Sequence, residues 1–282
     1  MSASCRLHRA AFAVFVLVSL LGCAEQASFD AGEGVLWQTG MEQGDLVDWS
    51  SFPGEETSFD SGTCDRPPRG VTEGLAYQGD HALLLRALTP RGTESGCRQF
   101  RFPEANRRHE PRRYSFWLYL PHDYEIGYWA MVAQFKSRTP DGRNDSIWSL
   151  QLQNRADGKM VFVTTFKCQC EGPGKGVYER DAQGYNLQVF KRPDAVVEAR
   201  RWTRIEIDRL PSETFDGAIR VRQDGEEIFA FDHVVTTYEG GSDSFSLTAY
   251  GEDVYGRDGK RRSEWFETVF DDVKIEAIDG WL

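Results

Sequence analysis

Apolar and polar residues alternate with a period of two along most of the chain, and no stretch has the spacing of an amphipathic helix of three or more turns. In Tyr114–Leu120, for example, Tyr, Phe and Leu alternate with Ser, Trp and Tyr, and the run ends before Pro121. Such alternation is typical of strands with one buried face. It predicts strands over residues 114–120, 129–135, 146–153, 160–166, 202–208, 218–223, 227–231, 244–250 and 270–276.

Turn sequences separate these strands. An Asp-Gly pair occurs at 141–142, 157–158 and 224–225, and the last two are typical of hairpins. Many strands at this spacing favour an all-β fold, a two-sheet antiparallel β-sandwich, over alternating helices and strands. Residues 168–198 are the least regular stretch, and we interpret them as a long loop.

The N-terminus differs from the rest. Two arginines precede an apolar run over residues 10–21, which is too short to span a bilayer as a helix, and a glycine and Cys23 end the run. This order resembles a bacterial lipoprotein signal. It predicts a signal peptide over residues 1–22 and lipidation of Cys23. The alternative is an ordinary signal peptide that contains a cysteine.

The lipoprotein hypothesis also fixes the remaining boundaries. Residues 23–34 are small, polar and acidic, as in a tether, and residues 35–282 form one β-jelly-roll domain because no Pro- or Ser-rich linker divides them. Ala24, rather than Asp, follows the cysteine, which predicts an exported protein anchored through its lipid in the outer membrane. The net charge of −11 argues against a nucleic-acid partner, and we expect a monomer.

Four cysteines remain once Cys5 is cleaved off and Cys23 is lipidated. An even number in an oxidising compartment favours disulfides, and four cysteines allow three connectivities. We favour Cys64–Cys97, because Cys168 and Cys170 project from the same side of an extended segment and can close a small local loop.

Several segments resemble concanavalin-A-like jelly rolls. Residues 37–46 and 77–86 resemble the opening strands of that fold, and Phe270–Val273 resembles the last strand, which pairs beside the first. Residues 114–136, with Tyr-Leu-Pro-His-Asp-Tyr and Ala-Gln-Phe-Lys, resemble the heparin-lyase-I-like and glucuronan-lyase-like polysaccharide lyases. The resemblance implies a lyase that cleaves an anionic, uronic-acid-containing polysaccharide by β-elimination.

That chemistry needs a group that neutralises the uronate carboxylate, a base for the C5 proton and an acid for the leaving oxygen. Alternation puts Gln134 and Lys136 on one face of their strand, opposite Ala133 and Phe135. The resemblance matches Tyr250 to the family's catalytic tyrosine, with Tyr255 as a nearby alternative. Gln134, Lys136 and Tyr250 are therefore the candidate catalytic residues.

Lys136 stands where family members tend to carry a histidine. A lysine can neutralise the carboxylate or act as the base, or it can mark a protein that binds glycans without cleaving them. The alternative function is therefore a non-catalytic glycan-binding lipoprotein on the same fold. A glycoside hydrolase is a third hypothesis, with Glu206 and Asp208 on one strand face as its carboxylates.

Other residues are candidates for substrate binding. Six arginines at 98, 101, 107, 108, 112 and 113 form a basic cluster that suits carboxylates. Trp117 points to the opposite side of its strand from its apolar neighbours, so it can stack on a sugar ring. The predicted substrate-binding residues are Arg98, Arg101, Arg112, Trp117, Gln151, Gln153 and Tyr255.

The sequence also suggests one cofactor, a structural Ca²⁺ ion. Glu42, Asp45 and Asp272 can bring oxygen ligands together for a structural Ca²⁺, because the first and last strands are neighbours in this fold. Ordinary turn and edge-strand acids are the alternative interpretation of the same three residues.

Overall fold

The computed structural model describes residues 34–49, 70–89, 91–92, 94–101, 110–138, 144–168, 177–180, 186–258, 261–263, 265–279 and 281. All of them belong to one compact unit, residues 31–282. These residues form strands, turns and loops, and among them no helix is long and apolar enough to cross a membrane. The predicted signal, Cys23 and most of the tether lie outside the described residues.

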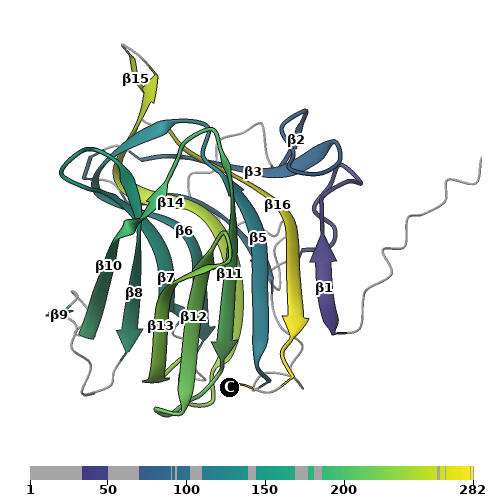
Figure 1. Ribbon diagram of the computed structural model, residues 1–282, viewed down its shortest axis with the longest axis vertical. Helices are drawn as coiled ribbons and strands as arrows, with labels where there is room; N and C mark the ends of the chain where they lie inside the picture. The colour runs from purple at the N-terminus through teal and green to yellow at the C-terminus, as the bar shows by residue number, and fades with distance from the viewer. Residues whose placement is uncertain are drawn as a thin grey trace, which may run out of the picture. The chain divides into compact units, whose positions relative to one another are not determined.

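Two eight-stranded antiparallel sheets form a jelly-roll β-sandwich, which confirms the predicted fold class (Figure 1). Sheet A has the order β13-β12-β11-β5-β16-β3-β2, and β1 pairs with β16. Its strands are β1 (Val35–Thr39), β2 (Gly70–Glu73), β3 (His81–Leu88), β5 (Arg112–Tyr119), β11 (Trp202–Leu210), β12 (Gly217–Gln223), β13 (Glu226–Val234) and β16 (Trp265–Ala277).

Sheet B has the order β15-β14-β6-β7-β8-β10-β9, and β4 pairs with β14. Its strands are β4 (Ser95–Arg101), β6 (Asp123–Arg138), β7 (Asn144–Asn154), β8 (Met160–Cys168), β9 (Val177–Arg180), β10 (Asn186–Val197), β14 (Ser242–Asp258) and β15 (Arg261–Ser263). Every strand that the alternation predicts lies largely within one of these sixteen strands.

Aromatic side chains from both sheets meet in the core. The ring centres of Tyr114 on β5 and Phe135 on β6 are 4.8 Å apart. Arg209 on β11 crosses the same space to the Asp243 carboxylate on β14, with Nη2 and Oδ2 2.5 Å apart. Burial lowers the pKa of Arg209, but Asp243 and Tyr114 together outweigh burial and the net shift is upward. Apolar packing and the buried Arg209–Asp243 ion pair thus join the two sheets.

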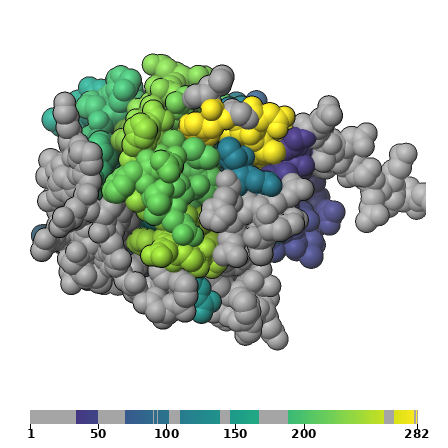
Figure 2. Space-filling view, turned by 90° about the horizontal axis from the view of Figure 1, so that it is seen from below, coloured from purple at the N-terminus to yellow at the C-terminus, as the bar shows by residue number. Residues whose placement is uncertain are grey.

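The last strand pairs beside the first, as the resemblance implies. β16 and β1 are antiparallel, with Val273 opposite Thr39. In Figure 2 the yellow surface of β16 adjoins the purple surface of the β1 segment. This closure brings residues that are more than 200 positions apart in the sequence to one edge of sheet A.

The interpretation of residues 168–198 as a long loop is wrong, because β10 occupies residues 186–197. Pro193 explains the missing signal: it lacks an N–H to donate, and the pairing of β10 with β8 is interrupted between Lys191 and Val196.

β4 was also not predicted. It carries Cys97, which is disulfide-bonded, but Cys64 lies outside the described residues, so the Cys64–Cys97 pairing stays a prediction.

Candidate active site

A bulge in β6 sets which side chains leave the core of sheet B. Opposite β7, Met131 faces Gln151 and Ala133 faces Leu150, so Val132 is an extra residue on β6. The bulge shifts the phase of the alternation by one position. Met131 and Gln134 therefore lie on the same outer face of the sheet, although they are three positions apart.

Lys136 shares this face with Gln134, whereas Ala133 and Phe135 are buried in the core, as the alternation predicts. The neighbouring β14 pairs with β4 without interruption, but its register against β6 shifts between Leu247 and Tyr250. Gln134 lies opposite Ser246, Lys136 opposite Ser244 and Met131 opposite Tyr250. Residues opposite each other in an antiparallel pair point to the same side. The structure thus brings all three candidate catalytic residues to one face of sheet B, called here the polar face.

Three neighbours fix the Tyr250 ring on the polar face. The guanidinium carbon of Arg98 lies 4.3 Å from the ring centre, and the Trp129 ring meets it edge-on at 4.9 Å. Gly96 of β4 lies opposite Tyr250, and a Cβ at position 96 would collide with the ring. The sequence analysis identified Arg98 but neither Trp129 nor Gly96, because the roles of these two residues depend on strand pairing.

Amides and hydroxyls from β6, β7 and β8 continue the polar face. Gln151 donates from Nε2 to Ser149 Oγ at 2.9 Å and to Thr165 Oγ1 at 3.2 Å, and the two hydroxyls are 2.6 Å apart. The Gln134 side chain lies opposite Ser149 and is 1 % exposed. Its Nε2 has no hydrogen-bond partner in the described part of the chain. Gln153 lies two positions from Gln151 on the same face of β7.

Lys136 lies at some distance from Tyr250 along the polar face. Its Nζ is 5.8 Å from the ring centre of Phe100 on β4, whereas the Tyr250 ring covers Gly96 on that strand. These two β4 positions are four residues apart, which corresponds to about 13 Å in an extended strand. Arg98 lies between them. The guanidinium of Arg98 is therefore closer to the phenol of Tyr250 than is Phe100, the β4 residue that Lys136 contacts.

Of the remaining candidate substrate-binding residues, three lie away from the polar face and Tyr255 lies further along β14. Arg101 points away from the polar face, with its guanidinium 5.1 Å from the Trp37 ring. Arg112 is buried in β5, and Trp117 on the outer face of sheet A stacks against Tyr77 at 3.7 Å. Tyr255 is on β14 beyond a second register shift, opposite Glu125. The predicted arginine cluster is thus divided between the sheets, and Arg107 and Arg108 lie outside the described residues.

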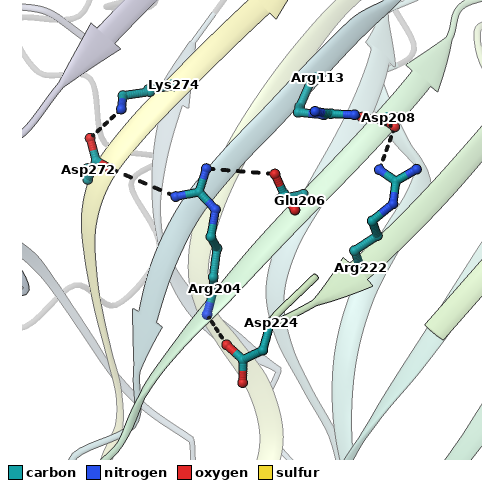
Figure 3. Close-up of polar contacts among 8 residues, drawn as sticks. All are labelled: Arg113, Arg204, Glu206, Asp208, Arg222, Asp224, Asp272 and Lys274. Carbon is teal, nitrogen blue, oxygen red and sulfur yellow. Dashed lines mark hydrogen bonds and ion pairs between the residues drawn. The ribbon is translucent and has the colours of Figure 1, made fainter. Parts of the chain in front are cut away.

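The geometry does not favour the glycoside hydrolase hypothesis. Asp208 accepts hydrogen bonds from Arg113 Nε at 2.7 Å and Arg222 Nη1 at 2.6 Å, on the outer face of sheet A (Figure 3). Burial raises the pKa of Asp208, but the two guanidinium groups outweigh burial and hold it below its usual value. A carboxyl group that stays ionised cannot serve as the general acid.

The three candidate Ca²⁺ ligands have separate partners. Glu42 Oε2 accepts a hydrogen bond from the Asp80 backbone at 3.0 Å, and Asp45 Oδ1 accepts one from the Val47 backbone at 3.1 Å. Asp272 pairs with the Lys274 ammonium at 3.2 Å. Within the described ranges, no three acidic, histidine or cysteine residues are placed to hold a metal ion together.

Comparison with known proteins gives the fold. No protein-family model and no curated protein matches the sequence. Among solved structures, endo-β-1,4-glucuronan lyase from the fungus Trichoderma reesei is 16% identical, with a TM-score of 0.62 over 86% of this chain and 96% of that chain. The PL-14 alginate lyase from Aplysia kurodai is 12% identical, with a TM-score of 0.54 over 86% and 99%. This chain has the fold of these lyases.

Alginate lyase vAL-1 from Chlorella virus shares the fold as well, at 9% identity and a TM-score of 0.51 over 86% of this chain and 100% of that chain. In all three comparisons nearly the whole length of the other protein is covered. Identities this low establish the arrangement of the strands, and the chemistry has to be argued from the side chains on the polar face.

Proposed function

We propose that this protein is a polysaccharide lyase that cleaves a uronic-acid polymer by β-elimination on the polar face of sheet B. One observation carries the proposal: the phenol of Tyr250 is fixed between Arg98 and Trp129, on the same face as the Gln134 Nε2, which no described residue accepts a hydrogen bond from. The proteins with the same fold are described as glucuronan and alginate lyases, which supports the substrate class.

Gln134 and Arg98 are assigned to the uronate carboxylate. Elimination needs this group neutralised, because the C5 proton becomes acidic only when the negative charge that develops on the carboxylate is stabilised. The buried Gln134 Nε2 has no hydrogen-bond partner among the described residues, and a buried unpaired donor costs about 1–3 kcal/mol. A bound carboxylate satisfies this donor, and the Arg98 guanidinium adds positive charge beside Tyr250.

Tyr250 is assigned to proton transfer. As the C5–H bond breaks, a double bond forms between C4 and C5, and the bond from C4 to the glycosidic oxygen breaks. The phenolate oxygen of Tyr250 takes the C5 proton, and the resulting phenol gives it to the leaving oxygen. Atoms and charge then balance without a second acid or base, and the tyrosine returns to its starting form.

Lys136 has two roles open to it, the base and a carboxylate partner, and the strand register favours the second. A base and an acid that serve one elimination must both come within hydrogen-bond distance of the same sugar. Lys136 contacts β4 about 13 Å from the position that Tyr250 covers. We therefore assign its ammonium to the carboxylate of a neighbouring sugar in the polymer.

The test is a screen of the purified protein against glucuronan and alginate. Cleavage by elimination leaves a conjugated double bond at each new end, which absorbs in the ultraviolet, and we expect this absorbance to rise with at least one polymer. The methyl-esterified polymer is the control for the carboxylate. If the protein binds a uronic-acid polymer but releases no unsaturated ends, it is a glycan-binding protein and not a lyase.

We further propose that the protein is exported and held by a lipid on Cys23 at the outer membrane. The basic start, the short apolar run and the cysteine that ends it support this anchor. A tether of about a dozen residues then leaves the domain free to meet a polymer outside the cell.

A further inference from the structure

Four aromatic rings gather on the outer face of sheet A, on the side of the sandwich opposite the polar face. Tyr77 stacks on Trp117, with ring centres 3.7 Å apart and planes at 16°. Trp202 meets Tyr77 edge-on at 6.0 Å and lies 5.2 Å from Tyr119. Tyr77 is 44% exposed although Trp117 covers one side of its ring, so its other side is open. We call Tyr77, Trp117 and Trp202 the Tyr77 platform.

The loop that carries Tyr77 is fastened to the sheet. The backbone N–H groups of Tyr77 and Gln78 both donate to Asp271 Oδ2, at 2.8 and 2.9 Å. Asp80 donates from its backbone to Glu42 at 3.0 Å. Asp271 is 1% exposed on β16, so the anchor is rigid. The ring of Tyr77 is therefore held in place before any ligand arrives, which lowers the entropy cost of binding.

The Arg204 guanidinium lies beside the platform and donates no hydrogen bond to another described residue. The Arg204 guanidinium carbon is 5.7 Å from the Trp117 ring centre. Its nitrogens are 3.7 Å from Glu206 and 4.0 Å from Asp272, beyond hydrogen-bond distance, and Figure 3 shows Arg204 between these two acids. Lys274 pairs with Asp272 at 3.2 Å. Among the described residues, then, Arg204 keeps its donors for a further acceptor.

We propose that the Tyr77 platform is a second polysaccharide-binding surface, separate from the polar face of sheet B. A sugar ring stacks on the open side of Tyr77 against Trp202, and the carboxylate of a uronate unit accepts hydrogen bonds from Arg204. The uronate class rests on the proposed function, whereas the stacking surface rests on sheet A alone. Such a surface holds the polymer near the enzyme between cleavage events and raises its effective concentration.

Affinity electrophoresis of the full chain in detergent tests this surface, with gels that contain glucuronan, alginate or a neutral polysaccharide. All proteins carry Tyr250→Phe, so that the polymer in the gel stays intact. We expect Tyr77→Ala and Arg204→Gln each to weaken binding of a uronic-acid polymer by roughly three- to tenfold. Tyr77→Phe keeps the ring and should bind normally. Arg192→Gln, which removes an exposed arginine from sheet B, is the control for charge.

A second measurement separates this surface from the site on sheet B. In proteins with Tyr250 intact, Tyr77→Ala should slow cleavage of long polymer but leave turnover of short oligosaccharides unchanged. The proposal is overturned if Tyr77→Ala binds the polymer normally at an unchanged melting temperature. It is also overturned if Tyr77→Phe loses as much polymer binding as Tyr77→Ala. The gel experiment measures binding without cleavage. Its result therefore tests the second binding surface whether or not the protein forms unsaturated products.

Discussion

The guanidinium of Arg98 lies over the ring of Tyr250, with its carbon 4.3 Å from the ring centre. The two residues are on adjacent strands, β4 and β14, and Arg98 lies opposite Thr248, two positions before Tyr250. A cation at this distance is attracted to the ring and limits its motion. In the proposed mechanism it also places positive charge beside the uronate carboxylate, so one residue would serve both the position of the phenol and the charge of the site.

Tyr250→Phe tests the proton transfer. The substitution keeps the ring, its contact with Arg98 and its packing over Gly96, but removes the oxygen that takes and returns the proton. We expect kcat to fall by roughly 10²–10⁴-fold while polymer binding changes little. Tyr255→Phe on the same strand is the matched control and should retain activity. If the loss occurs in the Tyr255 variant instead, the roles of the two tyrosines are exchanged.

Gly96→Ala tests the position of the phenol without changing any polar group. A Cβ at position 96 would collide with the Tyr250 ring, so the ring has to move away from β4. A displacement of about 1 Å can cost roughly 100-fold in rate, and we expect a loss of this size in kcat. Gly40→Ala is the control for loss of a glycine, because a Cβ there makes only ordinary contacts at 3.6 Å or more and the backbone is not left-handed. Full activity in Gly96→Ala would show that Tyr250 does not act from this position.

Lys136→Met separates the two roles of the lysine. Methionine keeps the unbranched chain over Phe100 but removes the charge. If Lys136 binds the carboxylate of a neighbouring sugar, KM for polymer rises by roughly tenfold and kcat changes little. A fall in kcat of about 100-fold at saturating polymer would instead identify Lys136 as the base. Steady-state kinetics on glucuronan or alginate give both constants in one experiment.

Sequence alternation predicted which residues of β6, β7 and β14 leave the core, because side-chain direction along a strand is a local property. It therefore placed Gln134, Lys136 and Tyr250 on outer faces correctly. It could not predict the bulge at Val132, nor that Trp129 and Gly96 enclose Tyr250, because these features depend on the register between strands that are far apart in the sequence.

The alternation of apolar and polar residues also cannot predict to which sheet a strand belongs. Trp117 does point away from the core, as predicted, but its strand β5 lies in sheet A, so the residue stacks with Tyr77 and not with a sugar on the polar face. The same limit applies to the arginines. Arg98 and Arg113 are close in the sequence, yet the first faces Tyr250 on sheet B and the second binds Asp208 on sheet A.

Cys23→Ser tests the proposed anchor. Serine has no thiol to receive the lipid, so the variant should not incorporate a labelled fatty acid and should leave the membrane fraction when cells are lysed. Cys97→Ser is the control, since Cys97 lies on β4 and is disulfide-bonded, and its loss should not affect labelling. Labelling that persists in Cys23→Ser would exclude this lipidation site.

The pairing of Asp208 with Arg113 and Arg222 predicts how stability depends on pH. Burial raises the pKa of Asp208, but the hydrogen bonds from the two arginines outweigh it and the pKa in the folded protein is lowered from 3.8. A carboxyl group with a lowered pKa stabilises the folded state above its unfolded pKa. This contribution is lost as the pH falls through the folded pKa, because protonation breaks the ion pairs.

Asp208→Asn should therefore lower the free energy of unfolding by roughly 1.5–3 kcal/mol at neutral pH, the range for hydrogen bonds to a charged group. The difference from the unmodified protein should narrow only below about pH 4, where the carboxylate is protonated in the unfolded chain. Asp232→Asn is the matched control, because its 3.4 Å pair with Arg220 is exposed and should contribute under about 1 kcal/mol. Urea unfolding of the three proteins across acid pH measures these differences. A difference between Asp208→Asn and the unmodified protein that does not change with pH would show that the arginines hold this position by hydrogen bonding alone, without the carboxylate's charge.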